Sequence, residues 1–165
     1  DLDTNNVIKS FDLKFNVIMN GASDGTAGEG WSVNFGRIPR DNGTGEGGFA
    51  PLPRGLTISF DPLDNGDDPS SIEVFIGGVS IANFPRTNAI NSSIRAVIIH
   101  WDFIGLDINF EGKVVCADLP TPGFSPGVGD IFAFTARTSI HRLVYLPNKD
   151  NWETRRMCLS GRSQG

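Results

Sequence analysis

The sequence predicts an all-β protein, folded as an antiparallel sandwich or barrel. Short apolar runs alternate with polar residues at a period of two, which is typical of strands with one buried face. Clusters of turn residues, drawn from 20 Gly and 10 Pro, separate these runs, and such even spacing is typical of all-β domains. No apolar pattern with a helical period precedes residue 140. We therefore expect less than about a tenth of the residues in helix, against about a third in typical globular proteins.

The first half of the chain contains five expected strands. Residues 8–19 alternate, with apolar side chains at the odd positions from 11 to 17 and polar ones between them. Trp31, Val33 and Phe35 alternate in the same way after a glycine-rich loop. Residues 37–53 form a long irregular stretch of a kind that often carries a binding loop or a flexible segment. The remaining strands are expected at 56–60, 72–76 and 79–82, with a hairpin turn at Gly77 and Gly78.

The second half continues the same pattern after a loop at residues 84–93. Residues 95–102 and 106–110 alternate, and Glu111 and Gly112 then turn the chain into another strand at 113–116. A link rich in Pro and Gly covers residues 121–129. The last strand with a clear pattern is expected at 131–136.

The bulk composition limits the class of protein. A chain of 165 residues with 39% apolar content and 12 Phe suits one domain with a substantial core. No run approaches 18 apolar residues, so we expect no membrane span. The net charge of −5 argues against nucleic acid as a partner. The chain starts at Asp1 without Met, which indicates a processed form or an excised fragment. Cys116 and Cys158 fit either one disulfide or two free thiols.

The most informative segment is the acidic loop that follows the strand at 56–60. Carboxylates and an amide in one short loop form the hard-oxygen ligand set that calcium takes in proteins. Asn-Gly and Asp-Pro are also ordinary turn chemistry, so residue types alone leave a solvated turn and a calcium site both open. The oxygen-bearing residues of the loop are Asp61, Asp64, Asn65, Asp67 and Asp68.

This loop resembles the metal-binding loop of the L-type (legume) lectins and their concanavalin A-like relatives. The resemblance lies in Phe60-Asp61, Asn65 and Asp68-Pro69. Three further segments match in the same order: Gly28–Gly36 resembles the family's A-D-G strand with Glu29 at the Asp position, Gly47-Gly48-Phe49 its Gly-Gly loop, and Gly129–Thr138 its V-x-V-G-F-S-A-x-T strand. The resemblance implies a two-sheet jelly roll of the concanavalin A type. It also implies a closing strand beside the first one, for which residues 142–146 are the candidate.

The resemblance also implies a binding site. The calcium would be bound by Asp61, Asn65, the Leu63 carbonyl, and Asp67 or Asp68; the glycan would be bound by Glu29, Gly48 and Asn65. Three features differ from the family. Glu29 is one methylene longer than Asp, and Leu63 stands where the family stacks an aromatic ring on the sugar. Ser59 replaces the glutamate ligand of the family's transition metal, so the resemblance supports one calcium and no second metal.

Aromatic residues elsewhere could supply the missing stacking surface. Trp31 and Trp101 alternate within strands, so we expect them in the core. Phe49 and Phe84 fall in expected loops and are the better candidates.

These features predict a non-catalytic, lectin-like, glycan-binding module, secreted or displayed at the cell surface and carried by a larger multidomain protein. The alternative is a structural or protein-interaction domain of the same fold. A third hypothesis is a glycoside hydrolase, but the paired-carboxylate strand of the related glucanases is absent, and Asp107 and Glu111 read as a solvated strand face. His100 reads as a core or sheet-face residue rather than a ligand, and no nucleophile–histidine grouping is evident.

The C-terminal end differs in charge from the rest. Residues 139–165 hold five basic and two acidic residues, a net of 5 − 2 = +3, while residues 1–138 hold nine basic and 17 acidic residues, a net of 9 − 17 = −8. We therefore divide the chain into a sandwich at 1–146 and a basic tail at 147–165 that is either disordered or docked on the acidic body.

Overall fold

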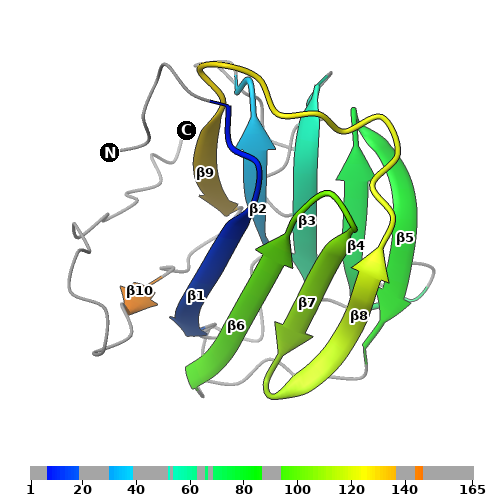
Figure 1. Cartoon of the computed structure of the whole chain (residues 1–165). Coiled ribbons are helices and arrows are strands. Elements are labelled where there is room, and N and C mark those ends of the chain that lie inside the picture. The colour runs from blue at the N-terminus through cyan, green and yellow to red at the C-terminus, as the bar shows by residue number, and fades with distance from the viewer. Residues whose placement is uncertain are drawn as a thin grey trace, which may run out of the picture.

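The structure, a computed structural model, is an all-β sandwich (Figure 1). It describes residues 7–18, 30–38, 52, 54–62, 66, 69–86, 94–136 and 144–146. Within these ranges there is no helix, and accordingly none long and apolar enough to cross a membrane. The strands are β1 (Phe11–Ile18), β2 (Trp31–Gly36), β3 (Gly55–Asp61), β4 (Ser71–Ile76), β5 (Val79–Pro85), β6 (Ile94–Trp101), β7 (Leu106–Phe110), β8 (Lys113–Leu119), β9 (Ile131–Ala136) and β10 (Val144–Leu146).

The strands form two antiparallel sheets that face each other. The first sheet has the order β10-β1-β6-β7-β8, and the second has the order β5-β4-β3-β2-β9. In Figure 1 the first sheet lies in front of the second, with β10 at the outer side of β1. β10 pairs with β1 in the register Asn16↔Leu146, so the predicted closing strand beside the first strand is confirmed, as is the two-sheet architecture.

Two strands run further than the sequence predicted. β8 continues to Leu119 because its end still pairs with β7, in the register Leu106↔Leu119, after two irregularities in the ladder. β5 continues to Pro85, opposite Ser71, through a segment expected to be loop. β5 is an edge strand, where the missing N–H of a proline removes no ladder bond.

The core fills the space between the sheets with alternate side chains of both. β1 shows the expected alternation, with Phe15 and Val17 buried while Asp12 and Lys14 are exposed. Aromatic rings dominate the packing between the layers. The buried core residues are Phe15, Val17, Trp31, Val33, Leu56, Ile58, Phe60, Ile72, Val74, Val97, Ile99, Trp101, Leu106, Ile108 and Phe110.

β2 is buried on both of its faces, which its alternating sequence did not predict. Trp31, Val33 and Phe35 face the core, and Ser32 and Asn34 on the opposite face are also buried. The outward-pointing side of β2 and its neighbours is called here the outer face of the second sheet. The predicted calcium ligand Asp61 lies at one end of this face, at the end of β3.

Candidate functional site

Asp61 is the predicted ligand that the structure places. It is the last residue of β3, it is partly exposed, and it pairs with Ser71 of β4. The preceding residue, Phe60, points its side chain into the core. Since successive side chains of a strand point to opposite faces, Asp61 belongs to the outer face of the second sheet. The Ser70 hydroxyl donates a hydrogen bond of 3.0 Å to the Asp61 carbonyl oxygen. The backbone that carries this carboxylate is therefore fixed by the sheet and by a neighbouring side chain.

Gly30, the residue before β2, lies against the same strand end. Its φ is +101°, and a Cβ at this position would collide with the Phe60 carbonyl oxygen and lie 3.3 Å from the Asp61 Cα. Only glycine fits such a close approach without strain. Gly30, which directly follows Glu29 in the chain, therefore lies next to the strand end that carries Asp61.

The connection that carries Gly48 starts and ends at the opposite end of these strands. The register pairs Gly36 with Gly55 there, and Trp31 with Phe60 at the Asp61 end. Leu52 is fully buried next to Gly55, on the side of β3 that faces away from the core. Leu52 thus lies on the outer face of the second sheet.

The remaining predicted site residues lie outside the part of the chain that the structure describes. Among the described residues, no group of three or more His, Cys, Asp or Glu could hold a metal ion. Asp61 itself fits a calcium ligand in chemistry and placement, because it is a partly exposed carboxylate on a rigid strand end. The residues outside the described ranges are Glu29, Gly48, Leu63, Asn65, Asp67 and Asp68.

A buried polar network occupies the outer face of the second sheet. The Asn34 side-chain Nδ2 donates to the hydroxyls of Ser32 (2.9 Å) and Thr135 (3.1 Å). The Asn34 side-chain oxygen, Oδ1, accepts from the Thr57 hydroxyl (2.8 Å). The Ser32 and Thr135 hydroxyls are 2.5 Å apart. One asparagine thus ties three strands together, β9, β2 and β3, with every polar group of its side chain satisfied.

This network was not predicted, although the sequence carries a signal for it. Each of the three strands places small hydroxyl or amide residues at alternate positions: Ser32 and Asn34, Thr57 and Ser59, and Thr135. Long charged side chains would be expected on a fully solvated face. Small, mutually compatible polar groups indicate instead a face that is covered and internally hydrogen-bonded.

A buried arginine lies near the end of the sandwich that carries Asp61. Arg95 of β6 is 3% exposed and forms an ion pair with Glu111. The guanidinium carbons of Arg86 and Arg95 lie 5.8 Å and 5.9 Å from the Phe110 ring centroid, and Phe110 contacts Phe60 at 5.6 Å between centroids. Cations at this distance are stabilised by the ring.

This arrangement changes the interpretation of Asp107 and Glu111 as one solvated face. Glu111 follows β7 in a turn with a φ of +56° and turns to Arg95 on the core side. Asp107 lies on the outer side and accepts a 2.7 Å hydrogen bond from the Asp118 N–H. The two carboxylates have separate partners on different sides of the sheet, so they do not form a hydrolase-type pair.

Three of the four aromatic residues considered for sugar stacking lie in or against the core. Trp31 and Trp101 are buried, as expected. Trp31 stacks on Phe60 with 3.9 Å between centroids. Phe84 was expected in a loop, but it lies in β5 and packs against the core because it pairs with Ile72. Phe84 is therefore not a free stacking surface for a ligand.

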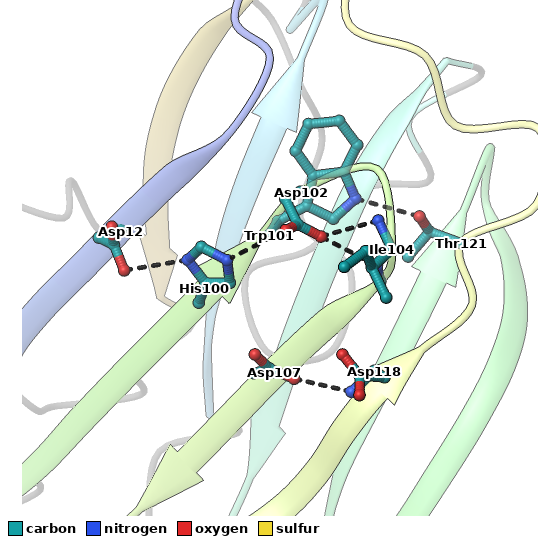
Figure 2. A network of polar contacts seen from close by, with 9 residues as sticks. Asp12, His100, Trp101, Asp102, Ile104, Asp107, Asp118 and Thr121 are labelled. Atoms are coloured by element: carbon teal, nitrogen blue, oxygen red, sulfur yellow. Dashed lines mark hydrogen bonds and ion pairs between the residues drawn. The ribbon is translucent and has the colours of Figure 1, made fainter.

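His100 lies on the outer face of the first sheet, which confirms the sheet-face interpretation. Figure 2 shows its ring between Asp12 of β1 and Asp102. Its Nδ1 is 3.0 Å from Asp12 Oδ1, and its Nε2 is 3.6 Å from Asp102 Oδ2. The hydrogen bond to Asp12 is the largest cause of a raised His100 pKa. The pKa of Asp102 is lowered, chiefly because its carboxylate accepts the Ile104 N–H.

No protein-family model matches the sequence, and no curated protein matches it. Solved structures do match. The chain resembles the basic winged bean lectin bound to Tn-antigen (TM-score 0.56, 21% identity, 82% of this chain and 63% of that chain). It also resembles the winged bean acidic lectin bound to methyl-α-D-galactose (TM-score 0.55, 19% identity, 84% of this chain and 66% of that chain). A third match is the potassium-bound carbohydrate recognition domain of Emp46p (TM-score 0.53, 12% identity, 81% of this chain and 66% of that chain).

These similarities establish the fold as that of the L-type lectins. The chain spans just under two thirds of the length of each of these lectins. At 12–21% identity, a shared fold does not by itself define what the chain binds.

Proposed function

We propose that this chain is a non-catalytic glycan-binding module whose site lies at the Asp61 end of the sandwich. The observation that carries the proposal is the contact between Gly30 and the Asp61 strand end. Gly30 directly follows Glu29 and Asp61 begins the acidic loop, so this contact supports a site built from two of the three loops that the family resemblance implies. The structural neighbours are themselves named as lectins or as a carbohydrate recognition domain, which supports the same class of function.

Each proposed residue has a definite chemical role. The Glu29 carboxylate accepts hydrogen bonds from adjacent sugar hydroxyls, and the Gly48 amide approaches the sugar closely because no side chain blocks it. Asn65 contacts both the sugar and a calcium ion. The ion is held by Asp61, Asn65, the Leu63 carbonyl, and Asp67 or Asp68. A bound calcium supplies a rigid loop, so little ordering cost remains when the glycan binds.

We further propose that the module is secreted or displayed at the cell surface and belongs to a larger protein. Since Leu63 offers no aromatic face, single-site affinity should be weak, with a Kd of about 0.1–1 mM. Useful binding then needs several sites or several modules acting together.

The test is a glycan array followed by isothermal titration, with calcium and with excess chelator. Glu29→Gln should weaken the sugar alone because it removes a charge-assisted acceptor, whereas Asn65→Ala should weaken sugar and calcium together. Asp12→Asn, on the other sheet, is the matched control and should leave both affinities unchanged. Glycan binding that survives Asn65→Ala would place the site elsewhere, and release of reducing sugar would support the hydrolase alternative.

The protein-interaction alternative has one observation in its favour. Ile98 of β6 and Val114 of β8 are 41% and 70% exposed on the outer face of the first sheet. They lie in one row across it, because both pair with Asn109. Apolar residues gathered on one face are typical of contact surfaces. A chain that binds no glycan in calcium would favour this alternative.

A further inference from the structure

A cavity of about 210 Å³ lies at the end of the sandwich remote from Asp61. Its walls come from the end of β2, the start of β3, the β4–β5 hairpin and the connection from β8 to β9. Figure 1 shows this last connection running across the end of the sandwich. The volume corresponds to about seven water molecules and is smaller than the pockets that take drug-sized ligands.

Two arginines line this cavity, and the backbone places them side by side. Arg37 directly follows Gly36, Arg54 directly precedes Gly55, and these two glycines are paired across β2 and β3. A Cβ at Gly36 would lie 2.8 Å from the Arg54 carbonyl oxygen. Glycine at this position therefore permits the close approach that brings the two arginine positions together.

The local charge of the cavity is opposite to that of the whole protein. Arg37 and Arg54 are exposed, and neither takes part in the ion pairs that the described part of the chain contains. Asp130 is the one carboxylate among the lining residues, and it already accepts a 2.7 Å hydrogen bond from the Gly127 N–H. The cavity thus has an excess of positive charge on a chain with a net charge of −5.

Phe124 forms an apolar part of the wall and is fixed in place. The Phe124 ring packs edge-on against Trp101 at 5.0 Å and Phe35 at 5.9 Å between centroids. Turns closed by Phe124 N→Thr121 O and Asp130 N→Gly127 O, both 3.2 Å, hold the connection. A wall that is rigid before a ligand arrives lowers the ordering cost of binding.

We propose that this cavity is a second binding site, for an anionic group carried on a body of about monosaccharide size. The anionic group is a carboxylate or a sulfate ester, since the guanidinium fork matches the planar or tetrahedral oxygens of these groups with two parallel hydrogen bonds. The body of the ligand contacts Phe124 and the neighbouring glycines. The site is independent of Asp61, which lies about 20 Å away along β3.

The proposal is tested with glucuronate, glucose 6-sulfate, glucose and inorganic sulfate as probes, by isothermal titration at low and high salt. Arg37→Gln/Arg54→Gln should weaken binding of the two acidic sugars at least tenfold. The matched control is Lys14→Gln/Lys113→Gln, which removes the same charge from exposed positions on the first sheet and should leave affinity within about twofold. Glucose should not bind here, and added salt should weaken the acidic sugars because the arginines are exposed.

Asp130→Asn provides a second, independent variant. The Asn side-chain oxygen can still accept from Gly127, so the turn is kept while a repelling charge is removed, and acidic sugars should bind more tightly. Asp61→Ala should leave their affinity unchanged, which separates this site from the proposed glycan site. Absence of binding, an equal loss in the lysine control, or inorganic sulfate binding as tightly as the acidic sugars would each overturn the proposal.

Discussion

Asp12 and His100 are directly opposed on β1 and β6, with 3.0 Å between Asp12 Oδ1 and His100 Nδ1. Asp102 lies on the other side of the ring (Figure 2). On the next strand of the sheet, Asp107 of β7 is the register partner of His100. The histidine is therefore flanked by two carboxylates, Asp12 and Asp102, while the Asp107 carboxylate accepts the Asp118 N–H instead. Protonation converts a neutral contact into a bridge between adjacent strands.

This relationship predicts a pH-dependent contribution to stability. The His100 pKa in the folded protein is above its ordinary value of 6.5. The contribution is therefore fully present below the unfolded pKa and is lost as pH rises through the folded pKa. His100→Gln should lower the melting temperature at about pH 5.5 and change it little at about pH 9.

The measurement is thermal unfolding of wild type and variant across this range, with an NMR titration of the His100 ring. His141→Gln, which removes the other histidine, is the control. The range stays above the acidic region, where the lowered pKa of Asp102 adds a contribution that is lost as pH falls. A difference between wild type and variant that is the same at both pH values would rule out this linkage.

The Asn34 network predicts a large loss of stability on truncation. Asn34→Ala removes the shared partner of three buried or partly buried hydroxyls, on Ser32, Thr57 and Thr135. The Thr57 hydroxyl loses its acceptor in a buried setting, while the Ser32 and Thr135 hydroxyls keep their contact with each other, so the loss of unfolding free energy should be about 1–3 kcal/mol. Urea unfolding measures this. Ser80→Ala breaks an exposed hydrogen bond to Glu73 and should cost less than about 0.5 kcal/mol; similar values for the two variants would contradict the argument.

Gly30→Ala should combine two penalties. The positive φ costs about 1 kcal/mol for a residue with a Cβ, and the collision with the Phe60 carbonyl must move the turn away from Asp61. Gly112→Ala is the matched control, since Gly112 has a φ of +74° and open space around its Cβ position. We expect a total of about 2–3 kcal/mol for Gly30→Ala and weaker glycan binding, neither of which Gly112→Ala should show. Equal losses of stability would mean that the backbone angle alone matters.

The strand pattern could be predicted because alternation is a local signal. β7 and β9 begin and end as predicted, and β3 differs by one residue at each end. The positions that could not be predicted depend on partners far away in the chain. Leu119 and Pro85 are strand residues only because β7 and β4 extend opposite them, and no local pattern records the length of a partner strand.

The candidate site could be predicted only in part, for a related reason. The family resemblance assigned Glu29 and Asp61 to one binding site before the register of β2 and β3 was known. The opposite positions of Asp107 and Glu111 were misread because a positive φ at Glu111 breaks the alternation on which the prediction depended. Non-glycine residues adopt this backbone conformation rarely, so a pattern argument assumes its absence.

A calcium ion bound at Asp61 would stabilise the folded chain. A ligand that binds only the folded chain stabilises it by RT ln(1 + [L]/Kd), about 2.7 kcal/mol at one hundred times the Kd. Millimolar calcium should therefore raise the melting temperature, and excess chelator should reverse the rise. Asp61→Asn should abolish the rise because it replaces a carboxylate ligand at the end of β3 with a neutral amide, while Asp12→Asn removes one charge from the first sheet and should keep it. Magnesium at the same concentration should have a smaller effect, since it needs a tighter octahedral shell. Identical melting curves in calcium and chelator would show that the acidic loop is a solvated turn.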